Sequence, residues 1–216
     1  SRLYIHDYTA GFTLQGLTIA GGYAGPILAI EGKGTLRLTD VDVSNSLKEG
    51  IGILNYGPLI LNRVSSTRNY AEGAWLQTAE FDGTRWIPRG GVTITSSSFN
   101  GNGTGGTGTG ANTIGLIIIS GGSTLLDGVS AVGNKGDGAQ IQTYTLSPII
   151  IKNSVFSRNF DESALTGSGG GLLVAGHTGA PITLENVTLD GNDEDGAYLA
   201  TLGNIILNQV RAGNNS

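Results

Sequence analysis

The sequence predicts an all-β fold, a right-handed parallel β-helix of about eight coils. Short segments rich in β-branched residues alternate apolar with polar positions, which is typical of strands, and no stretch has helical periodicity. The segments also repeat along the 216 residues at a nearly regular spacing. Three short strands fit each repeat, and a repeat that buries its apolar side only against its neighbours is one coil of a solenoid.

Each repeat contains a strand with an apolar anchor residue that we expect to point inward. The anchors are 23 to 25 residues apart where no loop is inserted, and 32 or 33 apart where one is. They are Leu14, Leu38, Leu61, Ile94, Leu126, Ile151, Leu184 and Leu207. A short bend and another strand follow each anchor strand, as at Val41 to Val43 and at Val187 to Leu189.

Asparagine follows the anchor by eight positions in each of the last six repeats. These residues are Asn69, Asn102, Asn134, Asn159, Asn192 and Asn215, while Gly22 and Ser46 take the position in the first two repeats. An amide repeated at one turn can bond the turn backbone and the amides of the adjacent coils. We therefore expect a structural asparagine ladder; six asparagines that bind a ligand are the less favoured alternative.

The remaining strand of each repeat begins after a glycine, with Leu3 starting its counterpart in the first repeat. The glycines are Gly25, Gly50, Gly73, Gly115, Gly138, Gly171 and Gly196. The second and fourth residues after each glycine should point outward. The second positions are Tyr4, Ile27, Gly52, Trp75, Ile117, Gln140, Leu173 and Tyr198; the fourth are His6, Ala29, Leu54, Gln77, Ile119, Gln142, Ala175 and Ala200. These sixteen positions hold one histidine and no Asp, Glu, Lys or Arg, so we expect an apolar outer face that inserted loops cover or a partner binds.

Three insertions, at residues 79–90, 103–114 and 160–169, flank this face and are expected to wall a shallow groove. Aromatic and arginine side chains of the kind that stack on sugars or anchor protein contacts gather there. The candidate binding residues are Tyr70, Trp75, Arg85, Trp86, Arg89, Ile117 and Tyr198. The alternative is that Trp86 and Phe81 only pin their own loop. The glycine-rich insertion 103–114 lacks the Lys and Ser/Thr of a phosphate-binding loop.

Composition excludes several classes of function. The chain has no cysteine, which rules out disulfides and thiolate chemistry, and its net charge of −5 without a basic cluster argues against nucleic-acid binding. No apolar run is long enough to span a membrane, and the first residues are not a signal peptide. We expect one β-helix domain over residues 1–216, a segment of a longer secreted protein or a stacking unit.

No catalytic constellation is recognisable, so we do not expect an enzyme. Ser/His/Asp and metal-ligand spacings are missing from the sequence. Glu49, Glu72, Asp137 and Asp195 each precede a glycine of the repeat and form a negative column at one turn. Calcium is the one cofactor that such a column would suit, although nothing in the sequence fixes the six to eight oxygens it needs.

Several motifs resemble known repeats. FNGN at Phe99–Asn102, FSRN at Phe156–Asn159 and GGLL at Gly170–Leu173 are similar to the repeats of polymorphic outer-membrane proteins, and the whole chain resembles the pectin-lyase-like superfamily of β-helices. The resemblance implies an extracellular or cell-surface protein, a stalk, adhesin or filament subunit that contacts further coils, other copies, surface carbohydrate or protein. The alternative is a polysaccharide lyase, hydrolase or tailspike-like depolymerase, but the catalytic triplets of pectate lyases and polygalacturonases are missing here.

Overall fold

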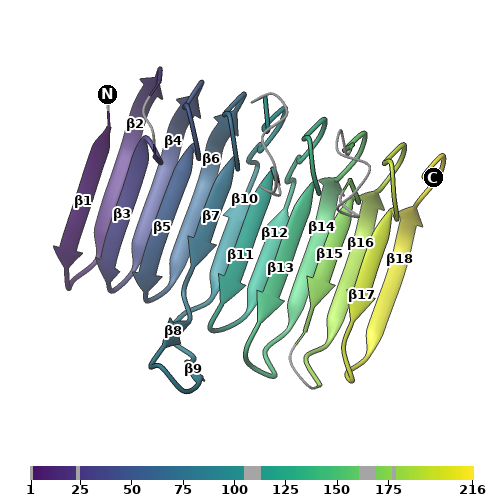
Figure 1. The fold of residues 1–216 in the computed structure, drawn as a ribbon. Helices are drawn as coiled ribbons and strands as arrows, with labels where there is room; N and C mark the ends of the chain where they lie inside the picture. Colours follow the sequence, from purple (N-terminus) through teal and green to yellow (C-terminus); the bar gives the residue numbers. More distant parts are fainter. Residues whose placement is uncertain (1, 23–24, 105–112, 161–168, 177–178) are drawn as a thin grey trace.

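The computed structural model describes residues 2–22, 25–104, 113–160, 169–176 and 179–216. Within these ranges every regular element is a strand, and the strands form two eight-stranded parallel sheets and one two-stranded hairpin (Figure 1). The chain winds from one sheet to the other and back, so each coil adds one strand to each sheet. The predicted fold class, a right-handed parallel β-helix, is confirmed. None of the described residues belongs to a helix that is long and apolar enough to cross a membrane.

The first sheet contains the glycine-led strands. In spatial order they are β1 (Leu3–Tyr8), β3 (Leu28–Lys33), β5 (Ile51–Tyr56), β7 (Ala74–Gln77), β11 (Leu116–Ser120), β13 (Ala139–Thr143), β15 (Leu172–Ala175) and β17 (Ala197–Ala200). Inward and outward residues alternate along each strand; in β5, for example, Ile51 and Ile53 are buried while Gly52 and Leu54 are partly exposed.

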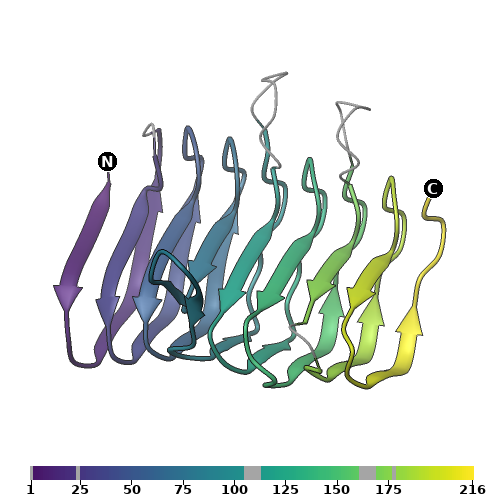
Figure 2. The ribbon, with the colours of Figure 1, turned by 60° about the horizontal axis from the view of Figure 1, so that its bottom comes forward.

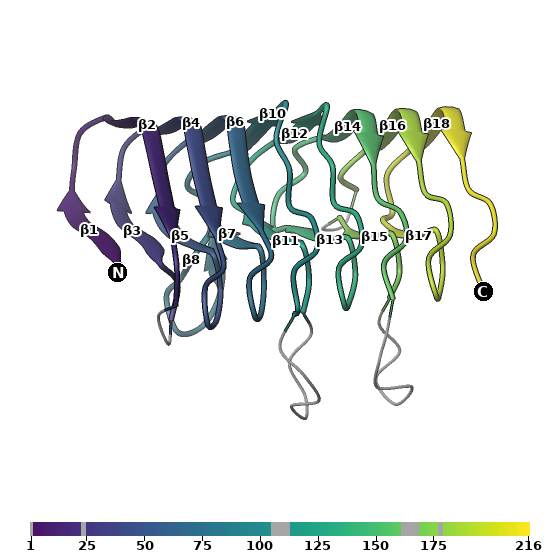
Figure 3. The same ribbon diagram turned by 90° about the horizontal axis from the view of Figure 1, so that it is seen from above.

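The second sheet contains the anchor strands. They are β2 (Phe12–Ala20), β4 (Leu36–Ser44), β6 (Leu59–Thr67), β10 (Val92–Thr95), β12 (Thr124–Asp127), β14 (Ile149–Val155), β16 (Ile182–Thr188) and β18 (Ile205–Arg211). All eight predicted anchors lie side by side in one register, from Leu14 opposite Leu38 to Leu184 opposite Leu207. Viewed from above, the two sheets form opposite sides of the coil (Figure 3).

The predicted third strand continues the anchor strand around a corner. A left-handed residue makes the bend in each coil, such as Asp40 with φ 54° and Asn153 with φ 48°. Beyond it β4 and β6 stay paired, with Val41 opposite Val64. In the fourth and fifth coils only isolated bridges at Ser98 and Ser130 remain. Most coils thus have two strands, and the anchor strand is the one that bends.

The core is a stack of apolar side chains that runs the length of the rod. Its largest fully buried residues are Phe99 and Phe156, the aromatic residues of the two FxxN motifs. Backbone bonds from Phe99 N to Ser130 O and from Ala131 N to Val155 O place Ala131 between the two phenyl rings. A small residue between two large ones keeps successive coils at the strand spacing, so the two motifs depend on each other through Ala131.

The six asparagines form one continuous chain of hydrogen bonds. The Nδ2 of each donates to the Oδ1 of the next, at 3.0 Å from Asn69 to Asn102 and 3.1 Å from Asn192 to Asn215. Each Oδ1 also accepts the backbone N–H of the preceding coil, as in Asn102 N to Asn134 Oδ1 at 3.0 Å. From Asn69 to Asn192 the ladder asparagines are buried. The turn backbone is thereby satisfied without water.

Glycine precedes the first-sheet strand because the ladder fills the space beside it. A Cβ on Gly73 would lie 2.5 Å from Asn102 Nδ2 and 2.4 Å from the carbonyl oxygen of Gly115. The same crowding recurs at Gly138, where Asn159 Nδ2 would be 2.7 Å away. Each glycine packs against the asparagine of its own coil, and this pairing couples the two repeated positions.

This pairing explains one wrong prediction, the register of the second coil. The structure pairs Leu28 with Ile51 and Ala29 with Gly52, so Ala29 takes the second outward position there and Ile27 is fully buried. Gly25 is not the equivalent glycine. The ladder position of this coil holds Ser46, which is smaller than asparagine and leaves room for the Ile27 side chain at the glycine position.

Candidate functional site

The outer face of the first sheet is the main candidate for a binding surface. From β5 to β17 its two outward columns carry no charged residue: Gly52, Trp75, Ile117, Gln140, Leu173 and Tyr198, and beside them Leu54, Gln77, Ile119, Gln142, Ala175 and Ala200. We call these twelve positions the uncharged face. Most of their side chains are partly exposed, whereas Gln77 is buried and its amide donates to the carbonyl oxygen of Ala79 at 2.9 Å.

Toward β1 and β3 the expected lack of charge is wrong. Because of the register of the second coil, the fourth outward position of β3 is Glu31, whose carboxylate accepts a hydrogen bond from the Tyr4 hydroxyl at 3.1 Å. His6, stacked on Tyr4 with ring centroids 5.1 Å apart, contacts Asp7 at 2.7 Å. The face is therefore polar in its first two coils and uncharged in the following six.

Insertion 79–90 forms a hairpin of β8 (Glu80–Phe81) and β9 (Trp86–Ile87) that stands out from the end of β7 (Figure 2). Asp82 closes its tip by accepting the backbone N–H groups of Thr84 and Arg85, both at 2.9 Å. The hydrogen bonds from the backbone N–H groups of Arg85 and Thr84 lower the pKa of Asp82. The charged side chain of Arg85 lowers this pKa by a smaller amount. At the base, Arg89 is ion-paired with Glu80 at 2.6 Å.

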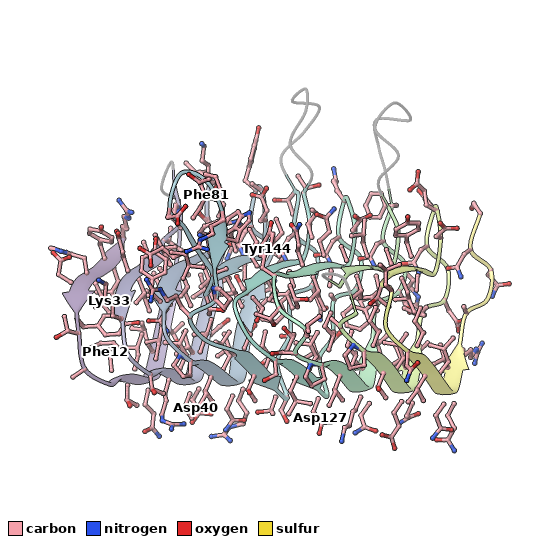
Figure 4. All side chains as sticks on the ribbon, turned by 90° about the horizontal axis from the view of Figure 1, so that it is seen from below. Phe12, Lys33, Asp40, Phe81, Asp127 and Tyr144 are labelled. Carbon is pink, nitrogen blue, oxygen red and sulfur yellow. The ribbon has the colours of Figure 1, made fainter. Side chains whose placement is uncertain are left out.

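Trp86 fixes this hairpin to a distant part of the rod. Its ring stacks on Tyr144, which follows β13, with centroids 4.5 Å apart and an interplanar angle of 17°, and it also contacts Phe81 at 5.3 Å. Figure 4 shows Phe81 and Tyr144 on the same side of the molecule, away from Asp40 and Asp127 on the second sheet. Burial raises the pKa of Tyr144, and this is the largest cause of its shift. The contact of Trp86 with Phe81 lies within the hairpin, whereas its stack on Tyr144 joins the hairpin to another coil.

The candidate binding residues do not form one cluster. Trp75 and Ile117 are neighbours in register on the uncharged face, and Tyr198 lies on the same column at the last coil. Tyr70 is an exposed residue of the ladder turn, at the opposite end of the strand from the hairpin with Trp86. Arg85 and Arg89 engage acidic partners within that hairpin. Of the other insertions, residues 105–112 and 161–168 lie outside the described part of the chain.

Sequence reasoning missed Tyr144 as a contributor to this side of the rod, and it placed Gln140 on the outer face without naming it as a candidate binding residue. Tyr144 occurs directly after a glycine-led strand, two coils beyond the hairpin, and this position was the only sequence signal available. Gln140 lies on the uncharged face, and its amide donates to Asp137 at 2.7 Å.

The predicted acidic column is interrupted. Backbone bonds place Ile114 after Glu72, and Gly170 between Asp137 and Asp195. Asp137 is buried and accepts the N–H groups of Gly169 and Gly170 at 3.1 and 2.9 Å. No group of three or more His, Asp or Glu residues suited to a metal ion occurs among the described residues.

A pocket of about 260 Å³ opens beside Asp137. It is lined by Asp137, Gly170, Leu172, Leu173, Glu194, Asp195 and Tyr198. Three of the lining residues are acidic, while Leu173 and the exposed ring of Tyr198 belong to the uncharged face. The pocket thus joins the acidic turn to the end of that face.

Fold and register together define this chain as a right-handed parallel β-helix protein. The sequence model of the protein family described as "Right handed beta helix region" matches residues 5–216, and the chain belongs to this family. Among solved structures it is similar to the crystal structure of pectate lyase Pel9A, with a TM-score of 0.56 and 15% sequence identity. The similarity covers 93% of this chain and 57% of that one, so the chain spans little more than half the length of the lyase. A search of curated proteins finds no match.

Proposed function

We propose that this chain is an extracellular structural or adhesive β-helix that binds through the uncharged face. The observation that carries this proposal is the absence of charge from all twelve outward positions between β5 and β17, in a sheet whose strands are held in register by the ladder turn. Trp75, Ile117 and Leu173 are apolar, partly exposed members of this face, and exposed apolar patches usually mark an interaction site. The outer positions of the second sheet differ, since Asp127, Lys152 and Glu185 follow one another there.

Charge placed on this face tests the proposal. Trp75→Asp and Leu173→Asp should weaken retention of the protein on a panel of immobilised neutral and acidic polysaccharides and extracellular-matrix proteins, because a partner would have to desolvate the new carboxylate. Thr95→Asp, on the outer face of the second sheet in the coil of Trp75, is the matched control. Binding through this face would be refuted if all three variants were retained equally. It would also be refuted if none of the immobilised polysaccharides and matrix proteins retained the original protein.

A second candidate function is an enzyme that acts on polysaccharide, and the pocket beside Asp137 favours it. Two carboxylates across a scissile bond are what glycoside hydrolysis requires, and Asp137 and Asp195 line one pocket next to Tyr198. The same polysaccharide panel tests this function through release of soluble oligosaccharides. Product that forms with the original protein and disappears with Asp195→Asn would replace the adhesive proposal with the enzymatic one.

A further inference from the structure

Two glutamates occupy the same turn position in neighbouring coils. Glu49 and Glu72 each precede a glycine of the repeat, and the Gly50 N–H donates to the Glu72 carbonyl oxygen at 3.0 Å, which fixes the two coils in register. Residues in equivalent positions of adjacent parallel strands are about 4.8 Å apart. The Glu49 and Glu72 side chains therefore start from neighbouring positions along the rod, and the charge of Glu49 acts on Glu72.

The equivalent positions in the coils on either side of this pair hold no positively charged residue. On one side the position after Glu72 holds the buried Ile114, whose carbonyl accepts the Gly73 N–H at 3.1 Å. On the other side the register of β3 with β5 places Pro26 beside Glu49. The charged groups that act on Glu72 are Glu49 and, with the opposite effect, Lys48. Insertion 103–114, in the adjacent turn of the sequence, contains no titratable side chain.

One oxygen of this pair lacks a partner. Glu49 Oε2 is inaccessible to solvent and makes no hydrogen bond to the described residues. A buried acceptor without a donor costs about 1–3 kcal/mol, and more when it is charged. A proton on the neighbouring carboxyl would supply the missing donor, as when two carboxyl groups share one site.

We propose that Glu49 and Glu72 share one proton across the step between their coils, which makes this turn a pH-sensitive joint in the rod. The Glu72 carboxyl donates its O–H to Glu49 Oε2 in acidic solution, and loss of that proton leaves two neighbouring, half-buried carboxylates. Burial of Glu72, with a smaller contribution from Glu49, raises its pKa above the ordinary value.

The sign of the pH dependence follows from this direction. Because the pKa of Glu72 is higher in the folded than in the unfolded chain, the stabilisation from the shared proton is fully present below the unfolded value and is lost as pH rises through the folded value. Thermal unfolding should therefore show a component of stability that decreases as the pH rises above about 4.3, the ordinary pKa of a glutamate carboxyl.

The test compares the original protein with Glu72→Gln, Glu49→Gln and Glu185→Gln over this pH range. Glutamine keeps the shape and a donor, so Glu72→Gln should remove the component that decreases with pH; Glu49→Gln should reduce it. Glu185→Gln, at an exposed position of β16, is the matched control and should retain the dependence of the original protein. Superimposable melting profiles for the original protein and Glu72→Gln would overturn the proposal.

A second measurement decides the matter even if a variant does not fold. In the original protein labelled with 13C at glutamate carboxyl carbons, one resonance should titrate above the range of the others. Absence of such a resonance would overturn the shared proton. So would a melting temperature at neutral pH that rises with calcium and falls with a chelator in the original protein but not in Glu49→Gln, since the pair would then hold a cation.

Discussion

At the scale of single residues, each ladder asparagine forms hydrogen bonds to several buried groups and also restricts the residue that precedes the neighbouring strand. Asn134 Oδ1 accepts both the backbone N–H and the Nδ2 of Asn102, while Asn134 donates to Asn159. One amide therefore satisfies three buried groups in two neighbouring coils. Its position beside Gly115 also decides which residue can precede the strand there, since a Cβ on that glycine would lie 2.5 Å from Asn134 Nδ2.

Asn134→Ala should destabilise the protein by about 2–6 kcal/mol, because two buried donors of Asn102 lose their acceptor at about 1–3 kcal/mol each. Urea unfolding followed by circular dichroism measures the change. Asn208→Ala, at an exposed position of β18, is the control and should change the free energy of unfolding by less than about 0.5 kcal/mol. Similar losses for the two variants would contradict a structural role of the ladder.

The stacked phenylalanines give a second prediction for a single side chain. Phe156 is fully buried against Ala131, so Phe156→Ala should leave a cavity and cost about 3–5 kcal/mol in free energy of unfolding. Phe156→Leu keeps most of the volume and should cost clearly less. The backbone bond from Phe156 N to Thr188 O places Leu189 on the other side of Phe156. If the alanine variant were no less stable than the leucine variant, the space between Ala131 and Leu189 would have to be closed by movement of the coils.

At the scale of elements, the hairpin β8–β9 is an addition to the coil whose position depends on one ring stack. Its own bonds, through Asp82 and the Arg89–Glu80 pair, define its shape. The contact of Trp86 with Tyr144 defines where it lies, because Tyr144 belongs to another coil. The hairpin should thus loosen without any loss of the core.

Trp86→Ala should accelerate trypsin cleavage after Arg85 about two- to tenfold, the factor that corresponds to an aromatic contact of about 0.5–1.5 kcal/mol. The global unfolding transition should change little. Tyr144→Ala removes the same contact and should give the same acceleration, whereas Tyr198→Ala, an exposed aromatic residue elsewhere, should not. Unchanged cleavage in both Trp86→Ala and Tyr144→Ala would show that the stack does not position the hairpin.

At the scale of the whole molecule, the rod is a one-dimensional stack in which each strand pairs only with the strands of the coils before and after it; the Trp86–Tyr144 stack reaches one coil further. Gly50 and Gly73 occupy the same position in consecutive coils, and each follows a glutamate. Removal of residues 50–72 therefore joins Glu49 to Gly73 and recreates the local sequence of the junction. Asn102 would then follow Ser46 in the ladder, where Asn69 follows it in the original protein.

The protein without residues 50–72 should fold into a rod that is shorter by about 4.8 Å, with retained β-structure and a lower free energy of unfolding. Small-angle scattering and circular dichroism measure the two properties. The control lacks residues 50–71, so the following strand is shifted by one position and its inward residues point outward. Folding of both variants would show that register does not govern the stack.

How much the sequence predicted depends on whether a residue repeats. The anchors and ladder asparagines recur at a fixed spacing, and the register of both sheets could be predicted from them over seven coils. The register failed in the second coil because Gly25 resembled the repeated glycine, while the pairing of glycine with asparagine became visible only in the packed turn. The hairpin contact between Trp86 and Tyr144 has no periodic signal and could not be predicted.

The sequence by itself determined the class of fold, because every coil of a solenoid must bury apolar residues at the same positions. This requirement is visible in the sequence as a repeat. It also determined which residues bond along the ladder and, except in the first sheet of the second coil, which positions face inward. Only the tertiary structure decided where the face loses its charge, that Glu49 Oε2 is left without a donor, and that Asp137 lines a pocket with Asp195. These features depend on what the neighbouring coil presents at one position, and a single deviation there, such as Ser46 or Ile114, changes the environment of every side chain around it.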